Sequence, residues 1–281
     1  INNFLIFLWA AFCRPTVHIK TTITEVKSMN EKKVAVVTGA SSGIGKECAE
    51  LFYQNGYTVY SFSRHGKDED GIFNVTCDVT DEEQVKAAFE TVFEKEGRID
   101  VLVNNAGFGI SGATELTTLA QAKKQFDVNF FGCFLCCKTV CAYMRKNGGG
   151  KIINISSMAA PLALPFQAFY SASKSAVNSL TLALANELRP FNISVCAFMP
   201  GDVKTAFTAQ REKETAGEEL YGSIIRRSVE QMEHDEQNGM SPKKIAKAVF
   251  ALSQKKHPKP LSTTGANYKL FAFLSKVLPA R

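Results

Sequence analysis

The 281-residue sequence lacks long runs of charge of one sign, internal repeats and low-complexity segments. Its 33 Lys and Arg residues exceed its 27 Asp and Glu residues by a net charge of only +6, spread along the chain. We therefore expect no nucleic-acid partner, since such partners usually require a concentrated basic surface. With 45% hydrophobic and 21% charged residues, the composition is that of an ordinary globular protein, which excludes a disordered or collagen-like chain.

The sequence also has few residues that could hold a structural metal. Cys133 and Cys136 form a C-x-x-C pair, but no second pair and no nearby histidine completes a zinc set. Four of the eight cysteines lie at positions 133, 136, 137 and 141, within one predicted helix. Because free cysteine is a common small buried residue, we expect a core or interface role rather than metal binding, redox chemistry or disulfides. This usage is typical of the reducing cytoplasm, where we place the protein.

Residues 1–12 are almost wholly apolar, yet this run is shorter than the roughly 20 residues that span a bilayer. It lacks the basic region and the cleavage pattern of a secretory signal. Since Met29 directly precedes the first strand-like run, we predict that residues 1–28 are a non-core extension of translated upstream sequence. A membrane-interface anchor is the less favoured alternative. The apolar pattern near Arg281 ends without a cap, which predicts a truncated C-terminus.

Apolar runs rich in Val and Ile alternate with amphipathic stretches of helical length. The predicted strands are residues 33–38, 58–62, 71–75, 99–103, 151–155 and 193–199, and the predicted helices are residues 44–55, 81–96, 119–147, 166–189 and 242–254. This alternation implies right-handed crossovers and a parallel sheet covered on both faces. We predict one α/β domain over residues 29–281, with a doubly wound, Rossmann-type sheet. The polar segment 201–240 fits a helical substrate lid.

The first predicted strand ends in a glycine-rich turn that leads directly into a helix. The turn contains Gly39, Ser41, Ser42, Gly43, Ile44 and Gly45. Free N–H groups and the dipole at a helix start attract anions, so a pyrophosphate fits there. The G-x-x-x-G-x-G spacing differs from the commoner dinucleotide fingerprint, and a turn without a ligand is the alternative when the loop is taken alone.

The second predicted strand ends at Ser63 and Arg64, where a residue that selects between NAD and NADP is expected. An acidic residue here would bind the 2′-hydroxyl of NAD. Arg64 can instead pair with a 2′-phosphate, and Ser63 does not repel it. We therefore predict NADP(H) as the cofactor, with a solvated surface arginine as the alternative.

A serine, a tyrosine and a lysine follow at a spacing that suits acid/base chemistry. Ser157 comes after the fifth predicted strand, and Tyr170 and Lys174 lie four residues apart on one face of a helix. A lysine ammonium favours the phenolate of a nearby tyrosine, and a serine hydroxyl can hold a carbonyl oxygen. Tyr-x-x-x-Lys by itself is more often a surface pair, but Ser157 and the glycine loop together favour a catalytic group.

With these motifs the sequence resembles the short-chain dehydrogenase/reductase family over nearly all of residues 31–281. The matching positions beyond the glycine loop are Asp78, Val79, Asn104, Asn105, Ala106, Gly107, Asn129, Ser157, Tyr170, Lys174, Pro200, Gly201, Val203 and Thr205. The resemblance implies that the cofactor is bound by the glycine loop, Arg64, Asp78, Val79, Asn105–Gly107, Tyr170, Lys174 and the 200–205 loop. Asp202 and Lys204 depart from the family pattern by adding charge.

The resemblance also implies a catalytic tetrad of Asn129, Ser157, Tyr170 and Lys174. Tyr170 would exchange a proton with the substrate oxygen while hydride passes between nicotinamide and carbonyl carbon. Lys174 would hold the nicotinamide ribose and lower the Tyr170 pKa, Ser157 would bind the substrate oxygen, and Asn129 would anchor a water. A regulatory dinucleotide sensor without turnover is the competing hypothesis, which retention of all four residues disfavours.

Among the family's branches, the looser resemblance is to hydroxysteroid and retinol dehydrogenases. It implies a small apolar carbonyl or alcohol substrate, such as a steroid, a retinoid or a lipid-like ketone. We expect the reductive direction, because intracellular NADPH pools favour it. Apolar residues on several faces of the helices at 119–147 and 166–189 predict a homodimer or tetramer.

Overall fold

The computed structural model describes residues 32–69, 71–213 and 217–277. The predictions for residues 1–28, for a start at Met29 and for a truncated end at Arg281 lie outside these residues.

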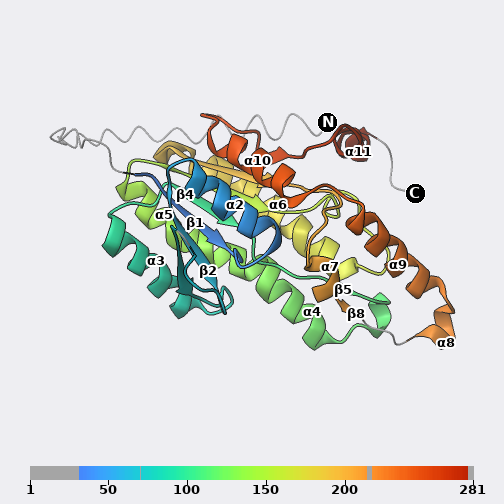
Figure 1. The fold of residues 1–281 in the computed structure, drawn as a ribbon. Coiled ribbons are helices and arrows are strands. Elements are labelled where there is room, and N and C mark those ends of the chain that lie inside the picture. The colour runs from blue at the N-terminus through green and yellow to red at the C-terminus, as the bar shows by residue number, and fades with distance from the viewer. Residues whose placement is uncertain (1–31, 70, 214–216, 278–281) are drawn as a thin grey trace. The chain divides into compact units, whose positions relative to one another are not determined.

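A seven-stranded parallel sheet forms the centre of the fold, in the order β3-β2-β1-β4-β6-β7-β9 (Figure 1). Its strands are β1 (Val34–Thr38), β2 (Thr58–Ser63), β3 (Ile72–Thr76), β4 (Val101–Asn104), β6 (Gly150–Ile155), β7 (Ile193–Phe198) and β9 (Leu261–Ser262). The strand order reverses between β1 and β4, and in doubly wound sheets ligands bind at the carboxyl ends of the strands beside such a point. The predicted doubly wound α/β fold is confirmed.

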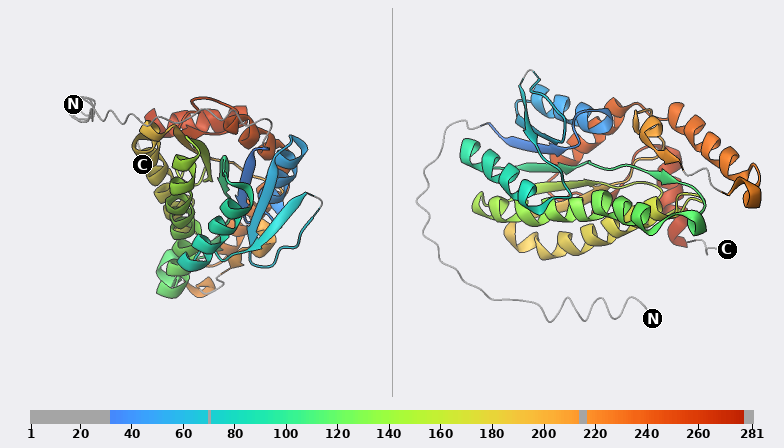
Figure 2. Two further views of the ribbon diagram at one scale, coloured as in Figure 1. Left: turned by 90° about the vertical axis from the view of Figure 1, so that its left-hand side faces the viewer. Right: turned by 90° about the horizontal axis from the view of Figure 1, so that it is seen from below.

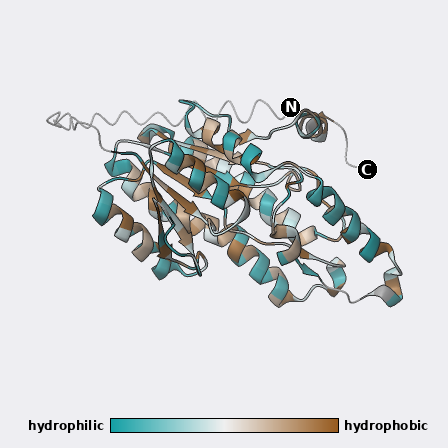
Figure 3. Ribbon diagram, in the orientation of Figure 1, coloured by the Kyte–Doolittle hydropathy of each residue, from teal (hydrophilic) through white to brown (hydrophobic). Residues whose placement is uncertain are grey.

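Helices cover both faces of this sheet (Figure 2). Along β1, Val34 and Val36 belong to the core on one face, while Ala35 and Val37 belong to the core on the other. This two-sided burial explains why the strands are apolar throughout rather than alternating. Figure 3 shows the apolar strands enclosed by helices with hydrophilic outer faces. The covering helices are α2 (Gly43–Gln54) and α10 (Pro242–Ser253) on one face, and α3 (Glu82–Glu96), α5 (Gly132–Lys146) and α6 (Ala168–Glu187) on the other.

The helix predicted over 119–147 is continuous but contains a π-helical turn. It consists of α4 (Leu119–Phe126), η2 (Asp127–Phe131) and α5. By length and composition residues Leu119–Lys146 could cross a membrane. Within the fold, however, the inner face of α5 packs in the core, where Cys133, Cys136, Cys137 and Cys141 are buried. The predicted core role of these four cysteines is confirmed.

Residues 201–240 fold largely as helices, as predicted. They contain α7 (Phe207–Gln210), β8 (Glu212–Lys213), α8 (Glu218–Tyr221) and α9 (Ile224–Gln237). Strand β8 pairs with β5 (Ile110–Ser111) outside the main sheet. Ile225 and Val229 of α9 are buried against Ala113, which anchors this segment to the chain after β4. The remaining elements are η1 (Thr114–Leu116), η3 (Arg189–Phe191) and α11 (Ala266–Val277).

Candidate active site

The glycine loop connects β1 to α2 at the carboxyl end of the sheet. Gly39 and Gly43 adopt φ values of +65° and +57°, which favour glycine. A Cβ on Gly45 would lie 2.4 Å from the Gly39 carbonyl oxygen, so only glycine permits this close backbone approach. Ser42 precedes the helix and makes no side-chain capping bond to it. The first turn of α2 therefore offers backbone N–H groups to an anion. Of the remaining predicted loop residues, Ser41 is exposed and Ile44 is half-buried.

The segment after β4 is tied to this loop. The Thr38 hydroxyl accepts hydrogen bonds from the backbone N–H groups of Asn105 (2.9 Å) and Ala106 (3.0 Å). The Asn105 side chain donates to the Gly39 carbonyl at 3.0 Å. A Cβ on Gly107 would lie 3.1 Å from Asn129 Oδ1, so Gly107 passes close to Asn129. The structure thus brings the two predicted cofactor-binding segments together.

Asn129 lies in the π-helical turn and is buried. Its Oδ1 accepts from the Phe108 N–H, and its Nδ2 donates to the Phe108 carbonyl, each at 3.0 Å. Nδ2 also donates to the Ser173 hydroxyl at 3.1 Å. Asn129 therefore fixes the backbone beside Gly107 against α6. Sequence patterns did not identify Phe108 or Ser173, because both contacts join residues far apart in the chain. A π-helical turn is frequent at functional sites but leaves no clear sequence signal.

Ser157, Tyr170 and Lys174 converge at the carboxyl end of β6. The Ser157 hydroxyl is hydrogen-bonded to Tyr170. Lys174 is buried, its Nζ donates to the Ile155 carbonyl at 2.9 Å, and it lies 5.9 Å from the centroid of the Tyr170 ring. The three residues that the sequence predicts to form one catalytic group are therefore adjacent in the fold. This arrangement can hold a carbonyl oxygen beside a phenol proton.

Burial shifts the two titratable groups in opposite directions. It raises the pKa of Tyr170 to about 12, more than the hydrogen bond from Ser157 lowers it. It lowers the pKa of Lys174 to about 8, because the charged ammonium loses water. Desolvation dominates the Tyr170 pKa, and the Lys174 ammonium is hydrogen-bonded to the Ile155 carbonyl. That Lys174 lowers the Tyr170 pKa stays a prediction.

The loop after β7 closes the site from the other side. A Cβ on Gly43 would lie 3.4 Å from Cβ of Thr205, so Thr205 is adjacent to the glycine loop. Val203 is buried and forms a bridge with Met240. Pro200, also predicted for this loop, accepts a hydrogen bond from the N–H of Met158 at 2.9 Å.

An aromatic contact in the same loop was not predicted from the sequence. The ring of Tyr268 in α11 covers Gly201, where a Cβ would lie 2.1 Å from the ring. The Tyr268 hydroxyl donates to the Asp202 carboxylate at 2.6 Å. Burial and this carboxylate raise the pKa of Tyr268 to about 12. Asp202 is one of the two charged residues that depart from the family pattern. Its carboxylate thus accepts a hydrogen bond from the Tyr268 hydroxyl.

The predicted adenosine-side residues lie at the ends of β2 and β3. Arg64 is exposed, and no ion pair with another described residue holds it. Ser63 is buried and donates to the Asn74 side chain at 2.8 Å. Asp78 accepts from the Thr80 N–H at 2.9 Å, and Val79 is buried. These residues share the sheet edge with the glycine loop, although no contact joins Arg64 to it.

Comparisons with known proteins agree with this geometry. A family model described as short chain dehydrogenase matches residues 33–216. A 3-ketodihydrosphingosine reductase of Bacteroides thetaiotaomicron is 42% identical over 231 residues, covering 81% of this chain and 86% of that protein. The chain therefore belongs to the short-chain dehydrogenase/reductase family, as its motifs predicted. It is an oxidoreductase of CH–OH and C=O groups.

Solved structures of the family share the fold. A short-chain dehydrogenase from Streptomyces avermitilis has a TM-score of 0.80 at 28% identity, covering 89% of this chain and 94% of that chain. ElxO with NADP bound has a TM-score of 0.71 at 30% identity, covering 85% of this chain and 99% of that chain. A 3-ketoacyl-(acyl-carrier-protein) reductase from Brucella melitensis complexed with NADH has a TM-score of 0.70 at 29% identity, covering 83% and 96%. Both forms of the nicotinamide cofactor thus occur among these neighbours.

Proposed function

We propose that this protein is an NADP(H)-dependent reductase that converts an apolar, lipid-like ketone or aldehyde into an alcohol. The observation that carries the proposal is the convergence of Ser157, Tyr170 and Lys174 beside the glycine loop. The similarity to a 3-ketodihydrosphingosine reductase supports a lipid-like ketone as the substrate class.

The residues present fit a nicotinamide dinucleotide. The glycine loop leads into the first turn of α2, whose backbone N–H groups have no side-chain cap from Ser42, and Thr205 lies against Gly43. Arg64 would pair with the 2′-phosphate, since its guanidinium is exposed and has no described ion-pair partner. Asp78 and Val79 would contact the adenine, and Lys174 the nicotinamide ribose. When bound, the cofactor supplies the hydride.

Within the protein, Tyr170 would donate the proton and Ser157 would hold the substrate oxygen next to it. The raised pKa of Tyr170, about 12, keeps the phenol protonated at neutral pH. A protonated phenol suits the donation of a proton to a developing alkoxide. The reductive direction is proposed because intracellular NADPH pools favour it. Asn129 would keep the Gly107–Phe108 backbone in place and anchor a water at the π-helical turn in which Asn129 lies.

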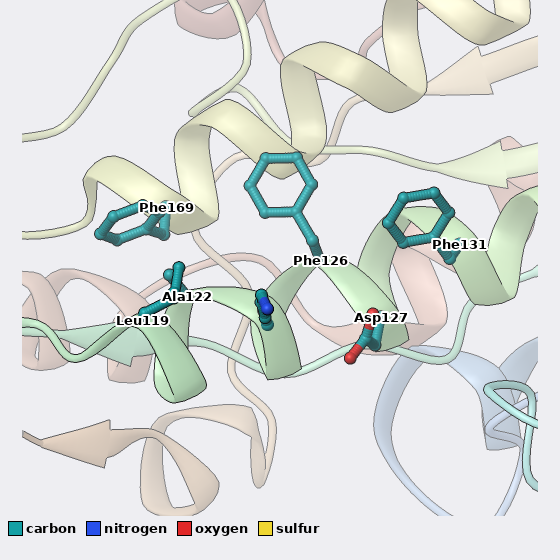
Figure 4. A pocket seen from close by; sticks show the side chains of 7 residues that line it. Leu119, Ala122, Phe126, Asp127, Phe131 and Phe169 are labelled. Atoms are coloured by element: carbon teal, nitrogen blue, oxygen red, sulfur yellow. The ribbon is translucent and has the colours of Figure 1, made fainter.

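A second copy of the chain is the proposed partner. Phe131 and Phe134 on the long helix are exposed, as is Leu182 on α6. Phe131 also lines a mostly apolar pocket of about 290 Å³, which Figure 4 shows between α4 and α6. Its lining includes Phe126, Phe131 and Phe169. A homodimer that covers this apolar surface, located in the cytoplasm, is consistent with the buried free cysteines.

The test is NADPH consumption by the purified full-length protein with a panel of long-chain ketones and aldehydes at fixed pH. We expect turnover of at least one apolar ketone, faster with NADPH than with NADH. Tight NADPH binding without consumption of any panel member would support the sensor hypothesis instead. Sedimentation at micromolar concentration tests the dimer, and a monomer would contradict it.

A further inference from the structure

Arg211 is a buried residue of the segment proposed as the substrate lid, and it lies near Tyr170. It follows α7, and its side chain is only 1% exposed. Its guanidinium carbon lies 5.7 Å from the centroid of the Phe207 ring, and that ring lies 5.7 Å from the ring of Tyr170. A Cβ on Gly109 would lie 3.7 Å from Arg211 Nε, so the segment after Gly107 and Phe108 passes beside it. Arg211 is thus one aromatic ring away from Tyr170.

The charge of Arg211 is balanced by one carboxylate. Nη2 donates to Oε1 of Glu236 in α9, and the Thr208 hydroxyl donates to the other oxygen, Oε2, at 2.6 Å. Glu236 is itself mostly buried. Both charges act on Tyr170, since Glu236 raises its pKa and Arg211 lowers it. The pair is therefore formally neutral and close to the proton donor.

The guanidinium retains two unused donors. Within the described part of the chain, neither Nε nor Nη1 of Arg211 has a hydrogen-bond partner, although both atoms are buried. Leaving a buried charged donor unpaired is costly, and such groups in native proteins normally find an acceptor. Lys213, two residues further along the lid, pairs with Glu233, and its own side chain is exposed. Arg211 differs because its free donors lie inside, on the side of Phe207 and Gly109.

We propose that Arg211 is a specificity-determining residue whose free donors bind a second oxygen of the substrate, a hydroxyl or carbonyl oxygen near the reacting ketone. This inference rests on the proposed reductase function and narrows its substrate class from a plain apolar ketone to an oxygen-bearing one. A neutral oxygen fits better than a carboxylate. Arg211 is already neutralised by Glu236, so a second carboxylate would place two anions beside one cation.

The test measures binding by isothermal titration calorimetry on the full-length protein saturated with NADP+, which has no hydride to transfer to a ketone, so that the heats report binding alone. The probes are a long-chain methyl ketone, two hydroxyketones of equal length with the hydroxyl one or two carbons from the carbonyl, and the matching 2-oxo acid. We expect at least one hydroxyketone to bind about 10- to 100-fold more tightly than the plain ketone, as for a hydrogen bond to a charged donor. Arg211→Met, which keeps the length of the side chain, should reduce this ratio to near one.

Two further variants separate binding from a structural role. Glu236→Gln should keep the preference for the hydroxyketone, because the amide oxygen can still accept from Arg211 while the amide NH2 group donates to the Thr208 hydroxyl. Glu236→Gln should also tighten binding of the 2-oxo acid about tenfold or more, since the Glu236 carboxylate no longer competes with the acid for Arg211. Lys213→Met, which breaks the neighbouring lid ion pair with Glu233, is the matched control. It should leave the ratios between the dissociation constants of the probes unchanged.

The outcomes are distinct. The inference is overturned if Arg211→Met still binds the hydroxyketone more tightly than the plain ketone by the parent's factor. It is also overturned if Arg211→Met and Glu236→Gln weaken the binding of all probes equally, since the ion pair would then be purely structural. Because the readout is binding, a protein that selects the hydroxyketone through Arg211 but turns over no ketone contradicts only the proposed function.

Discussion

The glycine-loop side of the site and the lid side are held by different forces. On the first side, Val37 of β1 and Phe52 of α2 are fully buried in one of the two large cores. On the second, α9 contributes only Ile225 and Val229 to a cluster of three buried apolar residues, completed by Ala113. A buried ion pair, Arg211 with Glu236, supplies much of the remaining contact.

This difference separates two tasks. The cofactor side depends on a rigid backbone, because a dinucleotide is recognised through main-chain N–H groups that must not move. The lid side depends on a few long-range side-chain contacts, which can change without dismantling the sheet. Substitutions on the two sides should therefore affect cofactor binding and substrate binding separately.

The largest expected effect comes from Tyr170, where the two sides meet. Tyr170→Phe keeps the ring but removes the proton, so kcat should fall by about 10²- to 10⁴-fold. The dissociation constant for NADPH should change much less than kcat, because the glycine loop, Arg64 and Lys174 keep their proposed contacts when only the phenol oxygen is lost. Steady-state kinetics and a fluorescence titration of NADPH check this. Tyr143→Phe, which removes a phenol from α5, is the control, and a Tyr170→Phe enzyme within tenfold of the parent would exclude Tyr170 as the acid.

The next effect concerns stability and tests the comparison directly. Phe52→Ala should lower the free energy of unfolding by about 3–5 kcal/mol, as for a large cavity in a rigid core. Ile225→Ala should lower it by less than about 2 kcal/mol, because its small cluster can collapse around the gap. Ile225→Ala should instead raise KM for the ketone. Denaturant unfolding followed by circular dichroism measures the free energy of unfolding of both variants. Equal losses of stability would show that the lid is part of the main core.

A smaller effect is expected on cofactor choice. Arg64→Asp should lower the ratio of kcat/KM for NADPH over NADH by roughly 10- to 100-fold, the value of a charge-assisted phosphate contact. Lys67→Asp makes the same charge change three residues further along the exposed loop and should alter the ratio much less. The parent enzyme should prefer NADPH. Equal ratios in the two variants would assign the preference to net charge rather than to Arg64.

The last effect is a pH dependence of stability at Lys174. Its pKa is about 8 in the fold against 10.5 for the free side chain, so burying the ammonium is unfavourable at pH below 8. Between those two values the unfolded chain binds more protons, and the parent gains stability as pH rises. Relative to Lys174→Met, the gain should be about 1 kcal/mol per pH unit.

Thermal or denaturant unfolding of both proteins across this range measures the Lys174 effect. Lys138→Met replaces an exposed lysine that pairs with Glu82, and it should show no such trend. A parent protein that loses stability relative to Lys174→Met over the same pH range would contradict the lowered pKa.

Most elements could be predicted because their signals are local. The strand and helix patterns located the six long strands and five main helices to within about two residues at most ends. The misses include two-residue strands such as β5 and β8, which form only by pairing with each other, the bounds of α9 within the predicted helical lid, and α11. The apolar stripe of α9 is narrow, and a charged sequence hid it.

By itself, the sequence determined the doubly wound sheet, the glycine loop and the spacing that joins Ser157, Tyr170 and Lys174. These depend on residues near one another in the chain, whose periodicity and backbone freedom act before any packing. The tertiary structure alone decided that burial raises the Tyr170 pKa, and that Arg211 lies near Tyr170 with two unpaired donors. Both depend on burial and on contacts between distant segments, because desolvation is a property of the packed site and not of any one residue.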